Sequence, residues 1–110
     1  MNDRPSGVEC SASEPFALRV IGDDMAPEFR DGHIVIIDPG GVIRPGCFVV
    51  ANTQDGIVLR QLVVDGDRWR LQALDDRIEP ISIKPSPANI VGVVSQRAGK
   101  RRREHKRYDV

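Results

Sequence analysis

The sequence predicts an all-β fold: a small coiled sheet or partly open β-barrel of about six or seven short strands. Short runs rich in β-branched and aliphatic residues recur along the chain. Tight-turn signals such as Pro-Gly and Asp-Gly separate these runs. No segment keeps a 3.6-residue apolar period over three turns, as an amphipathic helix would. Together these three observations favour hairpins over helices.

The first expected strand, residues 16–21, alternates Phe16, Leu18 and Val20 with Arg19 and therefore has one face suited to burial. The later strands are expected, in order, at residues 33–38, 47–51, 57–64, 68–74 and 89–94. The turns expected between them read "DPGG", "RPGC", "QDG", "DGD" and "KPSP". Such short connections predict antiparallel neighbours.

The length of 110 residues suits a single hydrophobic core. We expect a flexible leader over residues 1–14, a folded domain over residues 15–96 and a basic flexible tail over residues 97–110. Residues 1–96 hold 9 Lys or Arg against 14 Asp or Glu, whereas residues 97–110 hold 7 against 2. No apolar run approaches the roughly 20 residues of a membrane span, and the N-terminus lacks an apolar signal segment. A cytoplasmic chain without a membrane partner is expected.

The cysteines and histidines do not form a metal-binding pattern. Cys10, Cys47, His33 and His105 are scattered along the chain, whereas metal ligands come in clusters with short spacings. We therefore expect no metal and no other cofactor. Cys47 lies in an apolar run and is expected to pack as a small hydrophobic residue.

Five segments in a fixed order carry a family resemblance. They read "ALRVIGDDMAPEFRDGHIVIID", "RPGCFVVA", "GIVLRQL", "RWRLQALDDRIEPI" and "IVGVVSQ". This order resembles the LexA/UmuD family of self-cleaving serine-lysine peptidases over about residues 15–96. In that family a strand leads into Gly-Asp-Ser-Met-x-Pro, and a later strand carries Val-Lys-Arg-Leu. The resemblance implies a β fold of the LexA C-terminal-domain type and a homodimer.

The resemblance places different residues at the two catalytic positions of the family. The serine of Gly-Asp-Ser-Met falls on Asp24, and the lysine of Val-Lys-Arg-Leu falls on Arg60. The family mechanism needs a lysine that can lose its proton to activate the serine. An arginine stays protonated, and an aspartate is a weak nucleophile toward an amide. No catalytic residue is therefore expected, and the chain is expected not to be an enzyme.

The two positions are expected to face each other across the cleft. We expect Asp24 and Arg60 to form an ion pair, since a carboxylate and a guanidinium can pair through two hydrogen bonds. The alternative is that both side chains point into solvent. The expected binding cleft comprises Asp23, Asp24, Met25 and Arg60, with Asp23 in a turn and Met25 in packing. His33 is expected to bind backbone rather than to act as a base.

The basic tail is the segment expected to contact nucleic acid. Its candidate residues are Lys100, Arg101, Arg102, Arg103, Lys106 and Arg107. Because no aromatic residue interrupts these cations, contact would be with phosphates, without sequence preference. The alternative is a solvated tail whose charge serves only solubility.

Three functions are open on the sequence. The favoured one is a catalytically inactive LexA/UmuD-like homologue that binds a peptide or protein in its cleft, or dimerises through exposed strand edges. The second is an active self-cleaving or peptide-cleaving enzyme with atypical residues. The third is a nucleic-acid accessory protein that acts through its basic tail.

Overall fold

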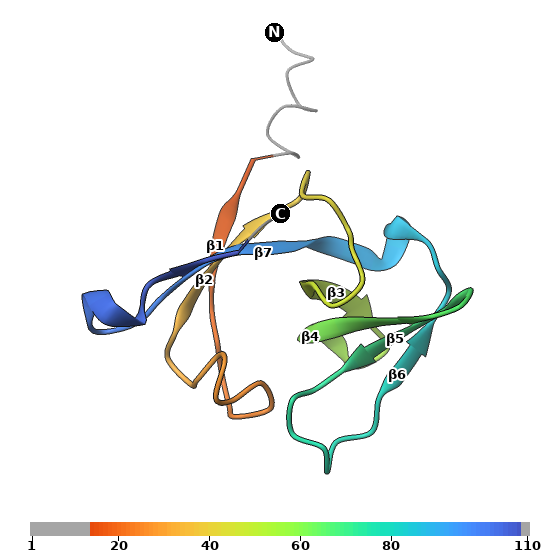
Figure 1. Cartoon of the computed structure of the whole chain (residues 1–110), viewed down its shortest axis with the longest axis horizontal. Coiled ribbons are helices and arrows are strands. Elements are labelled where there is room, and N and C mark those ends of the chain that lie inside the picture. Colours follow the sequence, from red (N-terminus) through yellow and green to blue (C-terminus); the bar gives the residue numbers. More distant parts are fainter. Residues whose placement is uncertain (1–13, 109–110) are drawn as a thin grey trace, which may run out of the picture.

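The computed structural model describes residues 14–108, and strands dominate this part of the chain (Figure 1). One antiparallel sheet has the order β1-β2-β7-β3-β4-β5-β6, with β8 paired to β7. The strands are β1 (Phe16–Arg19), β2 (Ile34–Asp38), β3 (Phe48–Thr53), β4 (Gly56–Asp65), β5 (Arg68–Gln72), β6 (Ile81–Ile83), β7 (Ile90–Ala98) and β8 (Lys106–Arg107). The two 3-10 helices are η1 (Pro87–Asn89) and η2 (Arg102–Glu104). The predicted β class and coiled sheet are confirmed.

Local turn chemistry accounts for the hairpins in the middle of the chain. Strands β3 and β4 are joined at Gly56, whose φ is +101°, and β4 and β5 are joined at Gly66, whose φ is +63°. Glycine adopts these angles without the clash that a Cβ atom would cause. The Thr53 hydroxyl also donates to the Gly56 carbonyl at 2.8 Å. These turns lie where "QDG" and "DGD" predict them.

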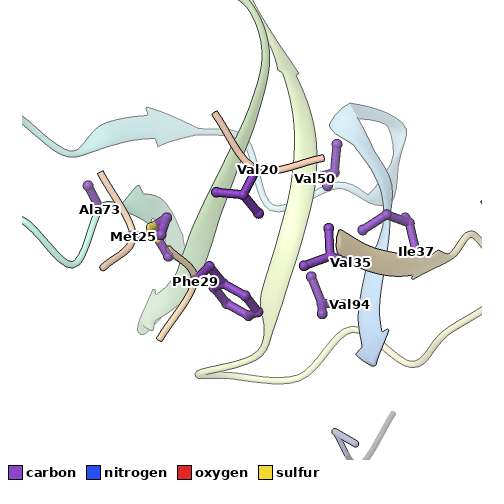
Figure 2. Packing of buried hydrophobic residues seen from close by; sticks show 8 residues of the cluster. All are labelled: Val20, Met25, Phe29, Val35, Ile37, Val50, Ala73 and Val94. Carbon is purple, nitrogen blue, oxygen red and sulfur yellow. The ribbon is translucent and has the colours of Figure 1, made fainter. Parts of the chain in front are cut away.

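The core is divided between the two faces of the sheet. One cluster of buried side chains, shown in Figure 2, consists of Val20, Met25, Phe29, Val35, Ile37, Val50, Ala73 and Val94. The other consists of Val49, Ala51, Leu62, Leu71 and Val93. Strands β3 and β7 contribute to both clusters because successive side chains of a strand point to opposite faces. The first cluster packs under the segment that follows β1, which carries three of the four predicted cleft residues, Asp23, Asp24 and Met25.

Residues 97–108 do not form the flexible tail that the charge pattern predicts. Strand β7 runs on to Ala98, and after η2 the chain returns as β8, which pairs with β7. Tyr108 then packs its ring against Phe29 and Phe48, with centroid separations of 5.6 Å and 5.8 Å. Tertiary packing therefore orders a segment whose composition favours solvation.

The remaining expectations about chain organisation concern the N-terminus and the membrane. The predicted leader, except its last residue Glu14, lies outside the described residues, and so does Cys10. Within residues 14–108, no helix has the length and apolar character needed to cross a membrane. Cys47 is half-buried, and this burial raises the pKa of its thiol. That environment fits the predicted packing role, because a raised pKa disfavours the reactive thiolate.

Candidate functional site

A cleft of about 350 Å³ lies between the end of β1 and the first half of β4. Apolar side chains form much of its walls: Leu18, Val20 and Ile21 from one side, and Ile57, Val58 and Leu59 from the other. Ile21 is 86% exposed and Ile57 is 61% exposed. Two large apolar side chains this exposed at one cleft are typical of a binding surface.

Both sides of the cleft also present backbone that the sheet leaves unpaired. Strand β1 pairs with β2 along one edge and has no partner on the other among the described strands. Strand β4 pairs with β3 from Gly56 to Gln61, but with β5 only from Gln61 onward. The outer edge of residues 57–60 is therefore open. Open edges of this kind accept an added strand.

The turn that carries Asp24 is fixed from both ends. The Gly22 N–H donates to the Asp31 carboxylate at 2.7 Å. The Asp24 carbonyl accepts hydrogen bonds from the backbone N–H groups of Leu74 and Asp75, each at 3.1 Å. Met25 is almost fully buried in the first core cluster. The backbone around Asp24 is thus tied to the loop after β5 and to the core.

Arg60 approaches Asp24 across the cleft. Its Nη2 lies 3.4 Å from Asp24 Oδ2, and its Nη1 donates to the Leu59 carbonyl at 2.8 Å. The Arg60 side chain is 11% exposed, whereas that of Asp24 is 51% exposed. The predicted contact is present, but as one long bond rather than a bidentate pair. A half-exposed carboxylate at this distance contributes little to stability.

The Arg60 guanidinium is anchored through its two terminal nitrogens, Nη1 to Leu59 and Nη2 to Asp24. Its Nε is buried and has no hydrogen-bond partner within residues 14–108. A buried donor is costly unless some acceptor satisfies it. The cleft therefore combines apolar walls, open backbone edges and the guanidinium of Arg60.

The other residues singled out in the sequence have different surroundings. Asp23 is exposed, and its backbone carbonyl, rather than its carboxylate, accepts the turn hydrogen bond from the Ala26 N–H at 3.1 Å. His33 is buried, and its Nδ1 accepts from the backbone N–H of Arg30 at 3.0 Å. His33 thus binds backbone, as predicted. Its Nε2 lies 3.0 Å from Glu104 Oε1, a contact that the sequence did not indicate.

The predicted nucleic-acid residues are not equivalent in the structure. Arg101 and Arg103 line a second pocket, of about 520 Å³, next to His33 and Glu104. Lys106 instead donates to the Glu28 carboxylate at 2.8 Å. The remaining members of the set are exposed; they are Lys100, Arg102 and Arg107.

Comparison with known proteins assigns the family. Residues 5–95 match the family model described as Peptidase S24-like. The chain belongs to this family. This S24-like chain is 34% identical over 92 residues to the LexA repressor of Geotalea uraniireducens, covering 81% of the chain and 43% of the relative. It is 32% identical over 93 residues to the prophage repressor CohE of Escherichia coli, covering 82% of the chain and 41% of the relative.

A third S24-like relative, the LexA repressor of Leptospira interrogans serogroup Icterohaemorrhagiae serovar copenhageni, is 37% identical over 70 residues, covering 63% of the chain and 34% of the relative. The chain thus spans less than half the length of the relatives it matches. The resemblance drawn from the sequence motifs is confirmed.

The family match corrects the prediction that the chain is not an enzyme. That prediction is overturned because residues 5–95 match a peptidase family and the relatives are LexA and prophage repressors. It depended on two positions, Asp24 and Arg60, placed by their neighbours in the sequence. The family match extends over residues 5–95, whereas the prediction relied on these two positions alone.

Sequence reasoning missed several residues that build the cleft. Ile21 and Ile57 lie at the ends of two expected strands and are not singled out in the sequence, yet both are largely exposed. A signal was present, because each apolar residue adjoins a glycine at a turn, where burial is difficult. No sequence signal marks Asp31, whose carboxylate accepts the Gly22 N–H. The two residues are nine positions apart, so no local pattern links them.

Proposed function

We propose that the S24-like chain binds an extended peptide segment in the cleft beside Asp24, Met25 and Arg60. The peptide lies between the end of β1 and residues 57–60 of β4 and adds as a strand to an open edge. Backbone hydrogen bonds supply affinity, and alternate side chains enter the apolar walls. Arg60 donates to a peptide carbonyl. The observation that carries this proposal is that two open backbone edges line one apolar cleft.

The test is binding of a fluorescein-labelled decapeptide with alternating apolar residues, followed by fluorescence anisotropy. Ile57→Asp places a charge on the cleft wall and is expected to weaken binding by at least about tenfold. The matched control is Val42→Asp, because Val42 is 53% exposed and is not among the residues that line the cleft. Equal loss in both variants, or no loss on Ile57→Asp, contradicts the proposal.

Cleavage of the bound peptide is a second candidate function, favoured by the match to a peptidase family. Mass spectrometry of the same mixtures detects it directly. If the residues at the cleft act in hydrolysis, Asp24→Ala abolishes the products while the peptide still binds. Products that persist in Asp24→Ala would assign cleavage to other residues. Binding and cleavage are thus measured separately on one substrate.

We also propose that the chain forms a homodimer, as its resemblance to the LexA/UmuD family implies. The open edge of β1 supports this proposal, because an exposed edge can pair with a second copy of itself. The cytoplasmic location expected from the sequence stays a prediction.

A further inference from the structure

The folded C-terminal segment builds a basic pocket apart from the peptide cleft. The pocket of about 520 Å³ is lined by four arginines, Arg30, Arg97, Arg101 and Arg103, with Glu104 as its carboxylate. Arg30 precedes β2, whereas the other three come from β7 and the segment around η2. The fold therefore gathers cations that lie about 70 residues apart in the sequence, which a solvated tail would not do.

The one carboxylate of the pocket is already bound. Glu104 Oε1 lies 3.0 Å from His33 Nε2, and Glu104 Oε2 accepts from the Arg101 backbone N–H at 3.2 Å. His33 Nδ1 accepts the Arg30 N–H at 3.0 Å, and its other ring nitrogen, Nε2, faces Glu104. The hydrogen bond from His33 lowers the pKa of Glu104. Glu104 therefore serves to hold the pocket together and offers little to a ligand.

The arginines divide into one that is fixed and others that remain available. Arg97 is 15% exposed; its Nε donates to the Glu104 carbonyl at 2.8 Å and its Nη1 to the Glu28 carbonyl at 2.7 Å. The side chains of Arg30 and Arg103 are exposed and make no hydrogen bond or ion pair with any residue in the described range 14–108. The pocket thus carries an excess of positive charge with unused guanidinium donors.

We propose that this pocket binds phosphate groups of a nucleic-acid strand. Guanidinium groups match phosphate oxygens with paired hydrogen bonds. Exposed Lys100, Arg102 and Arg107 extend the positive charge beyond the pocket, which suits a polyanion rather than a single ion. No Phe, Tyr or Trp side chain lines the pocket, and the ring of its His33 is buried, so bases are not stacked and binding has no sequence preference. This binding is independent of the peptide cleft.

The test uses the full chain, a fluorescein-labelled 20-nucleotide single-stranded DNA and anisotropy at several salt concentrations. The double variant Arg30→Gln/Arg103→Gln is expected to weaken binding about tenfold or more. For a single strand, loss of two phosphate contacts also makes the slope of log K against log salt shallower by about 1.4. The matched control is Arg68→Gln/Lys84→Gln, which removes two exposed cations outside the pocket.

Each outcome of this test supports or overturns the assignment of the pocket to nucleic-acid phosphates. Selective loss in the pocket variant, competition by pyrophosphate and unchanged binding of the decapeptide support it. Equal loss in both double variants overturns it, because attraction would then follow net charge alone. Tighter binding of a poly-glutamate peptide than of the oligonucleotide also overturns it, since the pocket would then recognise carboxylates. Circular dichroism of both variants shows whether they fold.

Discussion

The Glu28 carboxylate shows how single side chains join distant parts of this molecule. It accepts hydrogen bonds from the Lys106 ammonium and the Tyr108 hydroxyl, and the Arg97 guanidinium lies 3.6 Å away. Burial acts to raise the pKa of Glu28, but these hydrogen bonds and positive charges outweigh it and lower the pKa. Burial and the hydrogen bond to Glu28 raise the pKa of Tyr108. The ionised form of Glu28 is therefore the one the fold stabilises.

This direction of the Glu28 shift predicts an acid-dependent loss of stability. A carboxyl whose pKa is lowered by folding stabilises the protein fully above its ordinary value of 4.5. That stabilisation disappears as pH falls below 4.5 and through the lower folded value. Glu28→Gln should therefore lower the Tm at about pH 7, and the difference from wild type should shrink toward about pH 3.

Thermal denaturation followed by circular dichroism measures this difference at each pH. Glu79→Gln serves as the control at an exposed glutamate and should follow the wild-type profile. A Tm difference between Glu28→Gln and wild type that stays constant from neutral to acid pH would show that ionisation of Glu28 does not contribute.

At the scale of elements, the segment from Gly99 to Tyr108 acts as a clasp. It pairs β8 with β7 and places the Tyr108 ring on Phe29, which belongs to the core cluster beside the Asp24 turn. Glu104 packs closely over Gly99, where a Cβ atom would come within 2.3 Å of its carboxylate oxygen. The clasp thus supports the cleft turn and the basic pocket together.

Removal of this clasp should destabilise the domain, whereas removal of a solvated tail would not. Tyr108→Ala should lower the free energy of unfolding by about 3 kcal/mol, because it removes a ring packed on two phenylalanines. Tyr108→Phe keeps the ring and loses the hydrogen bond to Glu28, which corresponds to about 1 to 2 kcal/mol. Urea denaturation measures both changes. The exposed double variant Lys100→Ala/Arg102→Ala is the control; a loss as large as in Tyr108→Ala would contradict the clasp.

The open edges of the sheet differ in how well they are protected against pairing with another strand. Strand β6 is short and lies between Pro80 and Pro85, and β8 carries Lys106 and Arg107; prolines and cations both discourage pairing at an edge. Strand β1 is also preceded by a proline, Pro15, and carries one cation, Arg19, but of these three strands it alone borders the apolar cleft. Among the edges of the described sheet, β1 is therefore the one best suited to accept another strand, from a peptide or from a second chain.

This asymmetry predicts a measurable oligomeric state. Sedimentation velocity at micromolar concentrations should give the mass of two chains, since pairing at β1 buries backbone groups and apolar surface together. A saturating amount of the decapeptide should shift the chain toward the mass of one copy, because both occupants use the β1 edge. A dimer that persists with peptide bound would locate its interface elsewhere. A single-chain mass at all concentrations would contradict the homodimer.

The sequence alone determined the β class, the middle hairpins and the family motifs, because these depend on local properties. Period-two alternation and glycines such as Gly56 and Gly66 act within a few residues of themselves. Only the tertiary structure decided which distant groups meet. Glu104 contacts His33 across 71 positions of the sequence, and Tyr108 contacts Glu28 across 80. The composition of residues 97–108 predicts a solvated tail, because the segment has many charged residues and a single aromatic ring. In the structure, pairing with β7 and burial of the Tyr108 ring outweigh the preference of these charged residues for solvent.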